Sequence, residues 1–175
     1  MDVRFVTPDL RRLDELKSEA LALPFFEDER PLRGALGLVD WRLAGQLSRL
    51  LLASRATGAP GDAVLVPTRR RLAFDKLFLF GAGPSDAFDE KVFRRVSDHM
   101  FATLERAWVR SSVLALPGRS LERIAPARAL ELFIRVAGRH EGQDHVTLVE
   151  TAEGARAMGP VIERERRRER AADLA

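Results

Sequence analysis

The stretch "KLFLFGAGPSDAFDE", residues 76–90, decides the fold of this chain. It combines an apolar run, a short glycine-containing segment and a cluster of acidic residues. A short apolar run that ends at a turn is typical of a buried β-strand. Acidic residues are favoured in the first turn of a helix, where they complement the helix dipole. The stretch therefore predicts a strand, a tight turn, and a helix whose N-cap is Ser85 or Asp86.

The same glycines could instead belong to a phosphate-binding loop. A Walker-type loop needs a Lys followed by Ser or Thr after its last glycine, and "GAGPSD" has neither. A dinucleotide-binding fingerprint needs a third glycine where this chain has Asp86. Asp86, Asp89 and Glu90 would also repel a phosphate at the start of the helix. The residues favour a strand-to-helix turn, with Gly81 and Gly83 serving its geometry.

Outward from this stretch, apolar runs and helical periodicity alternate along the chain. The runs at 63–68 and 72–80 suggest strands covered on both faces, and the two tryptophans, Trp41 and Trp108, are expected to pack on amphipathic helices. This order predicts an α/β fold, a three-layer α/β/α sandwich with a mixed, mostly parallel sheet. The expected strands lie at 3–6, 19–26, 63–68, 72–80, 111–118 and 145–150, and the expected helices at 36–54, 86–109 and 126–138.

Composition narrows the class of protein. The chain has 175 residues, 46% apolar and 31% charged, with no cysteine and a net charge of +3. The lack of cysteine excludes disulfides, thiolate metal sites and a cysteine nucleophile. Neither a signal-peptide pattern nor a membrane-spanning run is found, so we expect a cytoplasmic protein without a membrane partner. Arginines balanced by acids predict a solvated surface, and nucleic-acid binding is not expected.

The C-terminal segment differs from the rest of the chain. After Pro160 the sequence "ERERRRERAADLA" has almost no apolar face. We expect one domain over residues 1–160 and a charged tail, helical or frayed, over residues 161–175.

The residues themselves do not indicate a catalytic site. His140 and His145 flank "EGQD", a spacing that matches no strong zinc signature, so we expect a polar loop and no metal site. No G-x-S-x-G nucleophile elbow is present. The loop "LPGRSLERIAP", residues 116–126, carries Arg119 and Arg123 after an expected strand. It could contact an anion at the carboxyl end of the sheet, or it could be an ordinary surface loop.

Read in order, several stretches resemble the N-terminal domain of the leucine aminopeptidase family. They are "SEALALPFFEDERPL", "GLVDWRLAGQLSRLLLASRATGAPGDAVLVP", "FDKLFLFGAGPSDAFDEKVFRRVSDHMFATL" and "SSVLALPG". The likeness covers about residues 3–160. In that family the metal ligands and catalytic residues belong to a following C-terminal domain. The resemblance therefore implies a free-standing relative of a regulatory or assembly domain, without peptidase activity and without a cofactor.

That N-terminal domain is itself similar to macro domains, which bind ADP-ribose. The likeness of "PDLRRLDELKSEALALPF" to the macro pattern implies that Asp9 could contact adenine. The family's diphosphate loop corresponds to "EDERPLRGALG", which offers Gly34 and Gly37, and its second phosphate loop to "PGRSLERIAP", which offers Gly118. Phe25 and Phe26 occupy the region of the Asn used by macro domains that cleave ADP-ribose, so hydrolysis is not expected.

Two functions follow as expectations. The first is a non-catalytic protein-interaction or assembly module, which binds a protein partner or a second copy and would expose a broad apolar surface. The second is a sensor of a nucleotide-like or other anionic ligand, bound at the carboxyl ends of the strands. A loop cleft lined by Arg33 and Arg119 would favour the sensor. Its ligand-binding residues would be Asp9, Arg33, Gly34, Gly37, Gly118 and Arg119.

Overall fold

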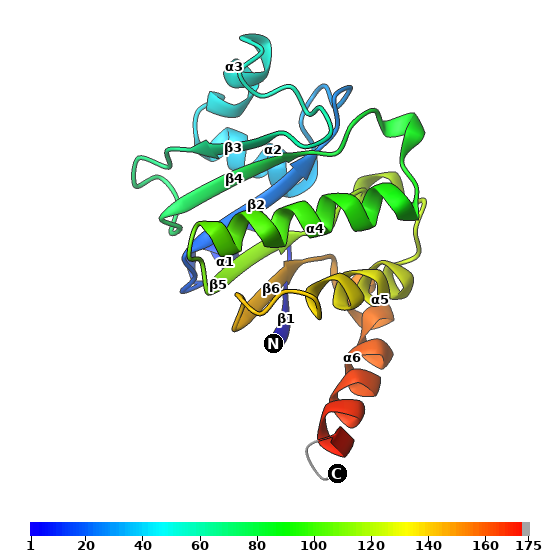
Figure 1. Cartoon of the computed structure of the whole chain (residues 1–175). Helices are drawn as coiled ribbons and strands as arrows, with labels where there is room; N and C mark the ends of the chain where they lie inside the picture. The colour runs from blue at the N-terminus through cyan, green and yellow to red at the C-terminus, as the bar shows by residue number, and fades with distance from the viewer. Residues whose placement is uncertain (173–175) are drawn as a thin grey trace.

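The structure, a computed structural model, describes residues 1–172 and contains one six-stranded sheet in the order β1-β6-β5-β2-β4-β3. Every neighbouring pair is parallel except β3 and β4. Helices cover both faces of the sheet (Figure 1), which confirms the expected three-layer α/β/α sandwich. The strands are β1 (Asp2–Val6), β2 (Ala20–Phe25), β3 (Ala63–Val66), β4 (Lys76–Gly81), β5 (Ser111–Ala115) and β6 (His145–Val149).

Alternate side chains of the central strands build two separate cores. In β4, Leu77 and Leu79 pack against the layer that contains α1 (Leu10–Asp14), α2 (Gly34–Arg42) and α3 (Gln46–Leu52). Phe78 and Phe80 point to the opposite face, which is covered by α4 (Glu90–Arg106), α5 (Pro126–Ala137) and α6 (Ala152–Ala172). Successive side chains of a strand point to opposite faces, so one short apolar run supplies both cores.

The helix expected at 36–54 is two helices. Ala44 and Gly45 adopt left-handed backbone conformations, with φ of +54° and +75°, and separate α2 from α3. The Asp40 carboxylate accepts hydrogen bonds from the backbone N–H groups of Leu47 and Ser48, at 2.8 and 3.1 Å. The apolar periodicity continued across this break, which is why the sequence pattern did not reveal it.

The opening stretch forms the expected strand and helix, but the N-cap of the helix is different. A 3-10 turn, η1 (Ser85–Ala87), precedes α4, and Asp89 is the N-cap, since its carboxylate accepts from Val92 N–H at 2.8 Å. Ser85 instead donates to Asp28 through its N–H, at 2.9 Å, and its hydroxyl. Gly81 is required by packing, because an added Cβ would lie 1.9 Å from the carbonyl oxygen of Ala59.

The strand β3 lies at one edge of the sheet, so the expectation that it is covered on both faces is wrong. Ala63 and Leu65 are exposed, and Leu65 keeps 58% of its surface accessible. The expectation that both tryptophans are packing residues on amphipathic helices is also wrong, since Trp41 is 75% exposed and Trp108 is 85% exposed. Apolar pattern alone does not distinguish an edge strand or a helix end from a buried position.

The helix α6 continues through Pro160 and extends away from the sheet (Figure 1). Its first half packs on the domain through Met158 and Val161, both buried. Residues 173–175, the end of the expected charged tail, lie outside the described residues. No helix within residues 1–172 is both long enough and apolar enough to cross a membrane.

Charged side chains join the helices α4, α5 and α6 along their exposed faces. Arg128 contacts Glu90 at 2.7 Å and Glu131 at 3.3 Å, and Glu131 contacts Arg164 at 2.6 Å. The hydrogen bond from Arg128 lowers the pKa of Glu90, and those from Arg164 and Arg128 lower the pKa of Glu131. A lowered carboxyl pKa stabilises the fold above the unfolded-state value, and this contribution is lost as the pH falls through the folded-state value.

Trp108 provides a test of backbone strain at the end of α4. It follows the C-cap Ala107 with φ of +55°, its N–H donates to the Glu105 carbonyl, and the Val109 N–H donates to the Leu104 carbonyl, both at 3.0 Å. This is the Schellman arrangement, in which the left-handed position favours glycine. We expect Trp108→Gly to raise the free energy of unfolding by about 0.5–1 kcal/mol, measured by urea denaturation. Trp108→Ala, which keeps a Cβ, should not reproduce the gain, and a loss in Trp108→Gly would show that the indole makes a stabilising contact.

Candidate functional site

A hollow of about 320 Å³ lies at the carboxyl ends of β2, β5 and β6. From β2 the chain continues to α2 on one face of the sheet, and from β5 it continues to α5 on the other face. Connections that leave neighbouring parallel strands in opposite directions open a crevice at the sheet edge, where ligands bind in open α/β folds. The hollow is therefore the position in this fold that is best suited to a small ligand.

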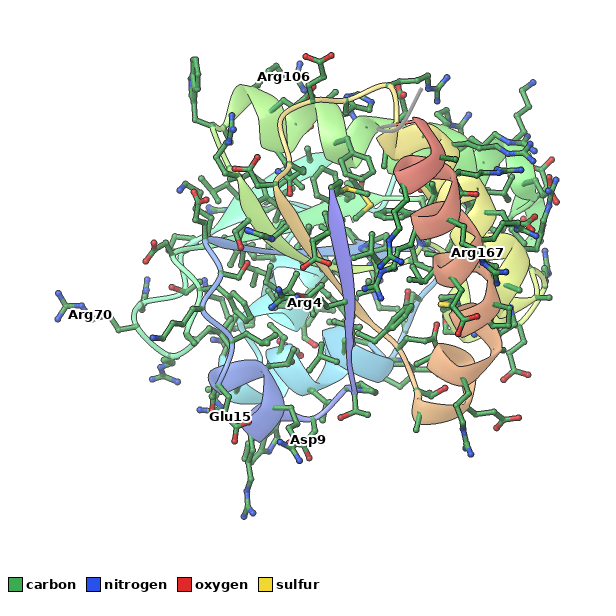
Figure 2. All side chains as sticks on the ribbon, turned by 90° about the horizontal axis from the view of Figure 1, so that it is seen from below. Arg4, Asp9, Glu15, Arg70, Arg106 and Arg167 are labelled. Atoms are coloured by element: carbon green, nitrogen blue, oxygen red, sulfur yellow. The ribbon has the colours of Figure 1, made fainter. Side chains whose placement is uncertain are left out.

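Four of the six predicted ligand-binding residues line this hollow, namely Arg33, Gly34, Gly118 and Arg119. The other two have structural roles elsewhere. Asp9 is the N-cap of α1 (Figure 2), and its carboxylate accepts from the N–H groups of residues 11 and 12 at 2.8 and 3.2 Å. An added Cβ on Gly37 would lie 2.7 Å from the carbonyl oxygen of residue 32, so this glycine permits close backbone packing.

Arg119, the expected anion contact, is already bound to a carboxylate. Its Nε donates to Glu150 at 2.7 Å, and its Nη1 donates to the carbonyl of Ile124 at 3.2 Å. The Glu150 side chain is 4% exposed and also accepts from the N–H of Thr151 at 2.9 Å. A buried carboxylate needs such partners, because removing a charge from water is costly. In this structure, Arg119 neutralises Glu150 and has no free charge to offer a ligand.

Gly118 permits an aromatic ring to approach the backbone. It has φ of +67°, and an added Cβ would lie 2.1 Å from a ring carbon of Phe88. Phe88 packs edge-to-face on Phe26, with 5.3 Å between ring centroids, and both rings are buried. The glycine of the expected second phosphate loop is therefore required by packing.

The charges around the hollow do not favour an anion. Arg33 and Arg119 line it together with three carboxylates, those of Glu29, Glu122 and Glu150. Burial raises the pKa of Glu29, although its Oε2 accepts from the backbone N–H of residue 26 at 3.2 Å. A phosphate would meet this set of acids as well as the two arginines.

Arg123, the second arginine of the same loop, holds two loops together. Its Nη1 donates to the carbonyls of Ser85 and Asp86, both at 2.9 Å. Ser85 in turn donates to Asp28, and these hydrogen bonds lower the pKa of Asp28. The contacts fix the loop after β5 against the turn after β4. Arg123 thus organises the rim of the hollow without lining it.

None of the three histidines lines the hollow. His140 contacts Glu105 through Nδ1 at 3.0 Å and Asp98 through Nε2 at 3.2 Å, and stacks on Phe101 at 5.4 Å. Its hydrogen bond lowers the pKa of Glu105. His145 is exposed. Among residues 1–172, no group of three potential metal ligands comes together.

The sequence did not identify the partners of His140 and Arg119. Asp98 and Glu105 lie on α4, about forty residues before His140, and no local spacing signals this contact. A weak signal existed for Glu150, since it is a charged residue at the end of an apolar strand and, by topology, at the same sheet edge as the loop of Arg119.

The sheet order and the hollow at the carboxyl edge define a macrodomain-like α/β/α domain. A Trypanosoma brucei macrodomain in complex with ADP-ribose superposes with a TM-score of 0.69 at 12% identity, over 91% of this chain and 68% of that one. A tomato leucine aminopeptidase mutant superposes with a TM-score of 0.62 at 15% identity, over 91% of this chain and 35% of that one. At these identities the likeness establishes the fold alone.

The sequence identifies the family more narrowly. Residues 22–138 match the cytosol aminopeptidase family, N-terminal domain, and the chain belongs to that family. A probable cytosol aminopeptidase of Nostoc punctiforme is 24% identical over 156 residues, which are 85% of this chain and 31% of that protein. The chain spans less than a third of the curated relatives that it matches.

The buried pair of Arg119 and Glu150 can be tested by a double-mutant cycle. We expect Arg119→Met to lower the free energy of unfolding by about 3 kcal/mol, because it leaves the Glu150 charge buried without its main partner. The double variant Arg119→Met, Glu150→Met should recover most of this loss. Urea unfolding of the wild type, both single variants and the double variant gives the coupling free energy between the two residues. Additive losses would contradict the description of the two residues as a coupled pair.

Proposed function

We propose that this domain is a non-catalytic protein-interaction or assembly module, and that it binds its partner at the free edge of β3. One observation carries the proposal, the combination of unpaired backbone groups and an exposed apolar side chain on that strand. An extended segment can add to such an edge by main-chain hydrogen bonding.

The direction of the backbone groups on β3 follows from its pairing with β4. The N–H of Gly81 donates to the carbonyl of Asp62 at 2.9 Å, which marks the two residues as a hydrogen-bonded pair. In an antiparallel ladder such pairs recur at every second residue, so Val64 also bonds to β4. The N–H and carbonyl groups of Ala63 and Leu65 then point away from the sheet, toward a partner.

The side chains at this edge suit a short partner strand. Leu65 pairs in register with Phe78, so it lies on the α4 face of the sheet and extends the apolar surface outward. Pro60 and Pro67 flank β3 and limit how far pairing can extend, a device that protects natural sheet edges from open-ended aggregation.

Two further observations support a non-catalytic module. The matching family description is that of an N-terminal domain. At the hollow, Arg119 and Glu150 are engaged with each other, so neither is free to act on a substrate. The name of the relatives, cytosol aminopeptidase, supports a cytoplasmic location.

Site-specific photo-crosslinking tests the proposal. With p-benzoylphenylalanine in place of Leu65, we expect illumination of the producing cells to give a discrete higher-mass adduct. The same group at Arg11, an exposed residue on α1, should not give it. Ala63→Pro should reduce the adduct, because it removes an outward N–H that β4 does not use. The proposal would be contradicted if the photo-crosslinker gave the same adduct at positions 65 and 11, or if Ala63→Pro did not change the yield of the adduct.

The second candidate is a sensor of a nucleotide-like ligand in the hollow. It is favoured by one observation, that Arg33, Gly34, Gly118 and Arg119, chosen from the sequence, line the same hollow. Arg33 is exposed and forms no ion pair within the described residues, although its charge also acts on the neighbouring Glu29. Binding of a phosphate would also require Arg119 to exchange Glu150 for the ligand.

A thermal-shift titration distinguishes this candidate. A ligand that binds only the native state raises its stability by about 2.7 kcal/mol at one hundred times its Kd. If the sensor is correct, we expect ADP-ribose, AMP or ATP to raise the Tm saturably and Arg33→Ala to abolish the rise. Asp9→Ala is the matched control, since loss of its cap lowers the initial Tm but leaves the hollow intact. No rise across the panel would remove the support for a sensor.

A further inference from the structure

A group of arginines lies beside the carboxyl end of β3. Arg69, Arg70 and Arg71 are on the loop from β3 to β4, and Figure 2 shows Arg70 extending into solvent. Arg49 and Arg55 lie with Arg69 around a surface hollow of about 400 Å³. We call these five residues the arginine cluster. Within residues 1–172, no member of the cluster has a carboxylate oxygen within 4.0 Å, whereas Arg110, Arg119 and Arg128 are all paired.

The loop holds two of these arginines in a strained conformation. Arg69 and Arg70 have φ of +49° and +59°, in the left-handed region that costs a side-chain-bearing residue about 1 kcal/mol or more. The N–H of Arg71 closes the turn by donating to the carbonyl of Thr68 at 2.9 Å, and the loop is anchored on the domain by the burial of Thr68 and Phe74. Strain of this kind persists where the surroundings fix the backbone, and it concentrates at functional sites.

We propose that the β3 edge binds an extended acidic segment of a partner protein as a seventh strand, and that the arginine cluster pairs with the acidic side chains. The inference rests on the proposed function and adds the chemistry of the partner. The outward N–H and carbonyl groups of Ala63 and Leu65 form hydrogen bonds with the backbone of the partner segment. The Leu65 side chain packs against an apolar side chain of that segment, and the arginines favour a segment that carries negative charge.

The features of the edge favour a peptide over a nucleic acid. Ala63 and Leu65 each present an N–H donor and a carbonyl acceptor, about 7 Å apart along the strand, and another polypeptide strand offers the acceptors and the donors that both need. Phosphates could pair with the arginines and accept from the N–H groups, but they offer no donor to the two carbonyls.

A second copy of this chain is a poorer match. Antiparallel pairing of two β3 strands, with Ala63 of one copy opposite Leu65 of the other, places each arginine loop toward the Asp62 end of the other copy. The carboxylate of Asp62 already accepts hydrogen bonds from the N–H and the hydroxyl of Thr57. Asp62 is the one acid within residues 57–62, so the five arginines would meet a single carboxylate of the second copy.

The position of the cluster also restricts the sequence of the partner. The arginines follow the carboxyl end of β3, so the acids of the partner must lie beyond the residue that pairs near Val66. In a strand antiparallel to β3 these acids are N-terminal to the apolar residues, and in a parallel strand they are C-terminal. Two peptides of opposite order separate the two directions.

The test uses fluorescein-labelled synthetic peptides and fluorescence anisotropy. The probes are Glu-Glu-Glu-Ser-Thr-Val-Thr-Val, its reversed sequence, and both with Lys in place of Glu. We expect one acidic probe to bind saturably and neither Lys probe to do so. The backbone amide NMR signals of Ala63 and Leu65 should shift on binding. Rim ion pairs are weak individually, so we expect Arg70→Glu with Arg71→Glu to weaken binding about tenfold, and raised salt to act in the same direction.

Ala63→Pro separates strand addition from simple charge attraction. It keeps the arginines and should weaken the acidic probe about tenfold or more, with an unchanged pattern of other amide signals as evidence of folding. Unchanged affinity in Ala63→Pro, or failure of both acidic probes to bind at millimolar concentration, would overturn the proposal.

The outcomes distinguish this inference from the proposed function. If Leu65 crosslinks to a partner but neither acidic probe binds, the edge is an interface and the acidic class is wrong. A dimer of the purified protein that Ala63→Pro dissociates, measured by light scattering, would make a second copy the occupant and overturn the acidic partner. If no adduct, dimer or probe complex forms, both proposals are wrong.

Discussion

The fold depends on the burial of β2 and β4 on both faces. These neighbouring parallel strands present alternate side chains to two cores, so residues as close as Leu79 and Phe80 stabilise different layers. A shift of β4 by one residue would exchange its two sets of side chains, with phenyl rings in place of leucines in one layer and leucines in place of phenyl rings in the other. This constraint fixes the register of the sheet and hence the positions of the loops at its carboxyl edge.

At the carboxyl edge of the sheet, the predicted ligand-binding residues Gly118 and Arg119 are engaged in packing and in an ion pair within the domain. The close approach of Gly118 to Phe88 and the burial of Glu150 beside Arg119 fill positions where a phosphate-binding loop would present free N–H groups and free charge. A hollow remains at this edge, but the negative charges of its acids and the positive charges of its arginines largely cancel. The same fold can therefore keep the geometry of a ligand site while the chemistry of that site changes.

The two edges of the sheet are chemically distinct. β1 is parallel to its neighbour, and the nearby carboxylates of Asp2 and Asp144 are paired with Arg4 and Arg110. β3 is antiparallel and short, and it leads directly into an arginine loop. The positive charge beside β3 restricts which partner approaches that edge, because like charges oppose association and unlike charges favour it.

The sequence pattern predicted the layers and the order of the six strands, because strand and helix periods are local properties of the chain, but it did not predict α1 or the separation of α2 from α3. Four residues predicted from the sequence to bind a ligand do meet at the carboxyl edge, since parallel strands end at the same side of a sheet. The roles of those residues depend on contacts that form only in the folded chain. The pairing of Arg119 with Glu150, the break at Gly45 and the exposure of Trp108 and Leu65 depend on neighbours distant in sequence, and periodicity carries no information about distant neighbours.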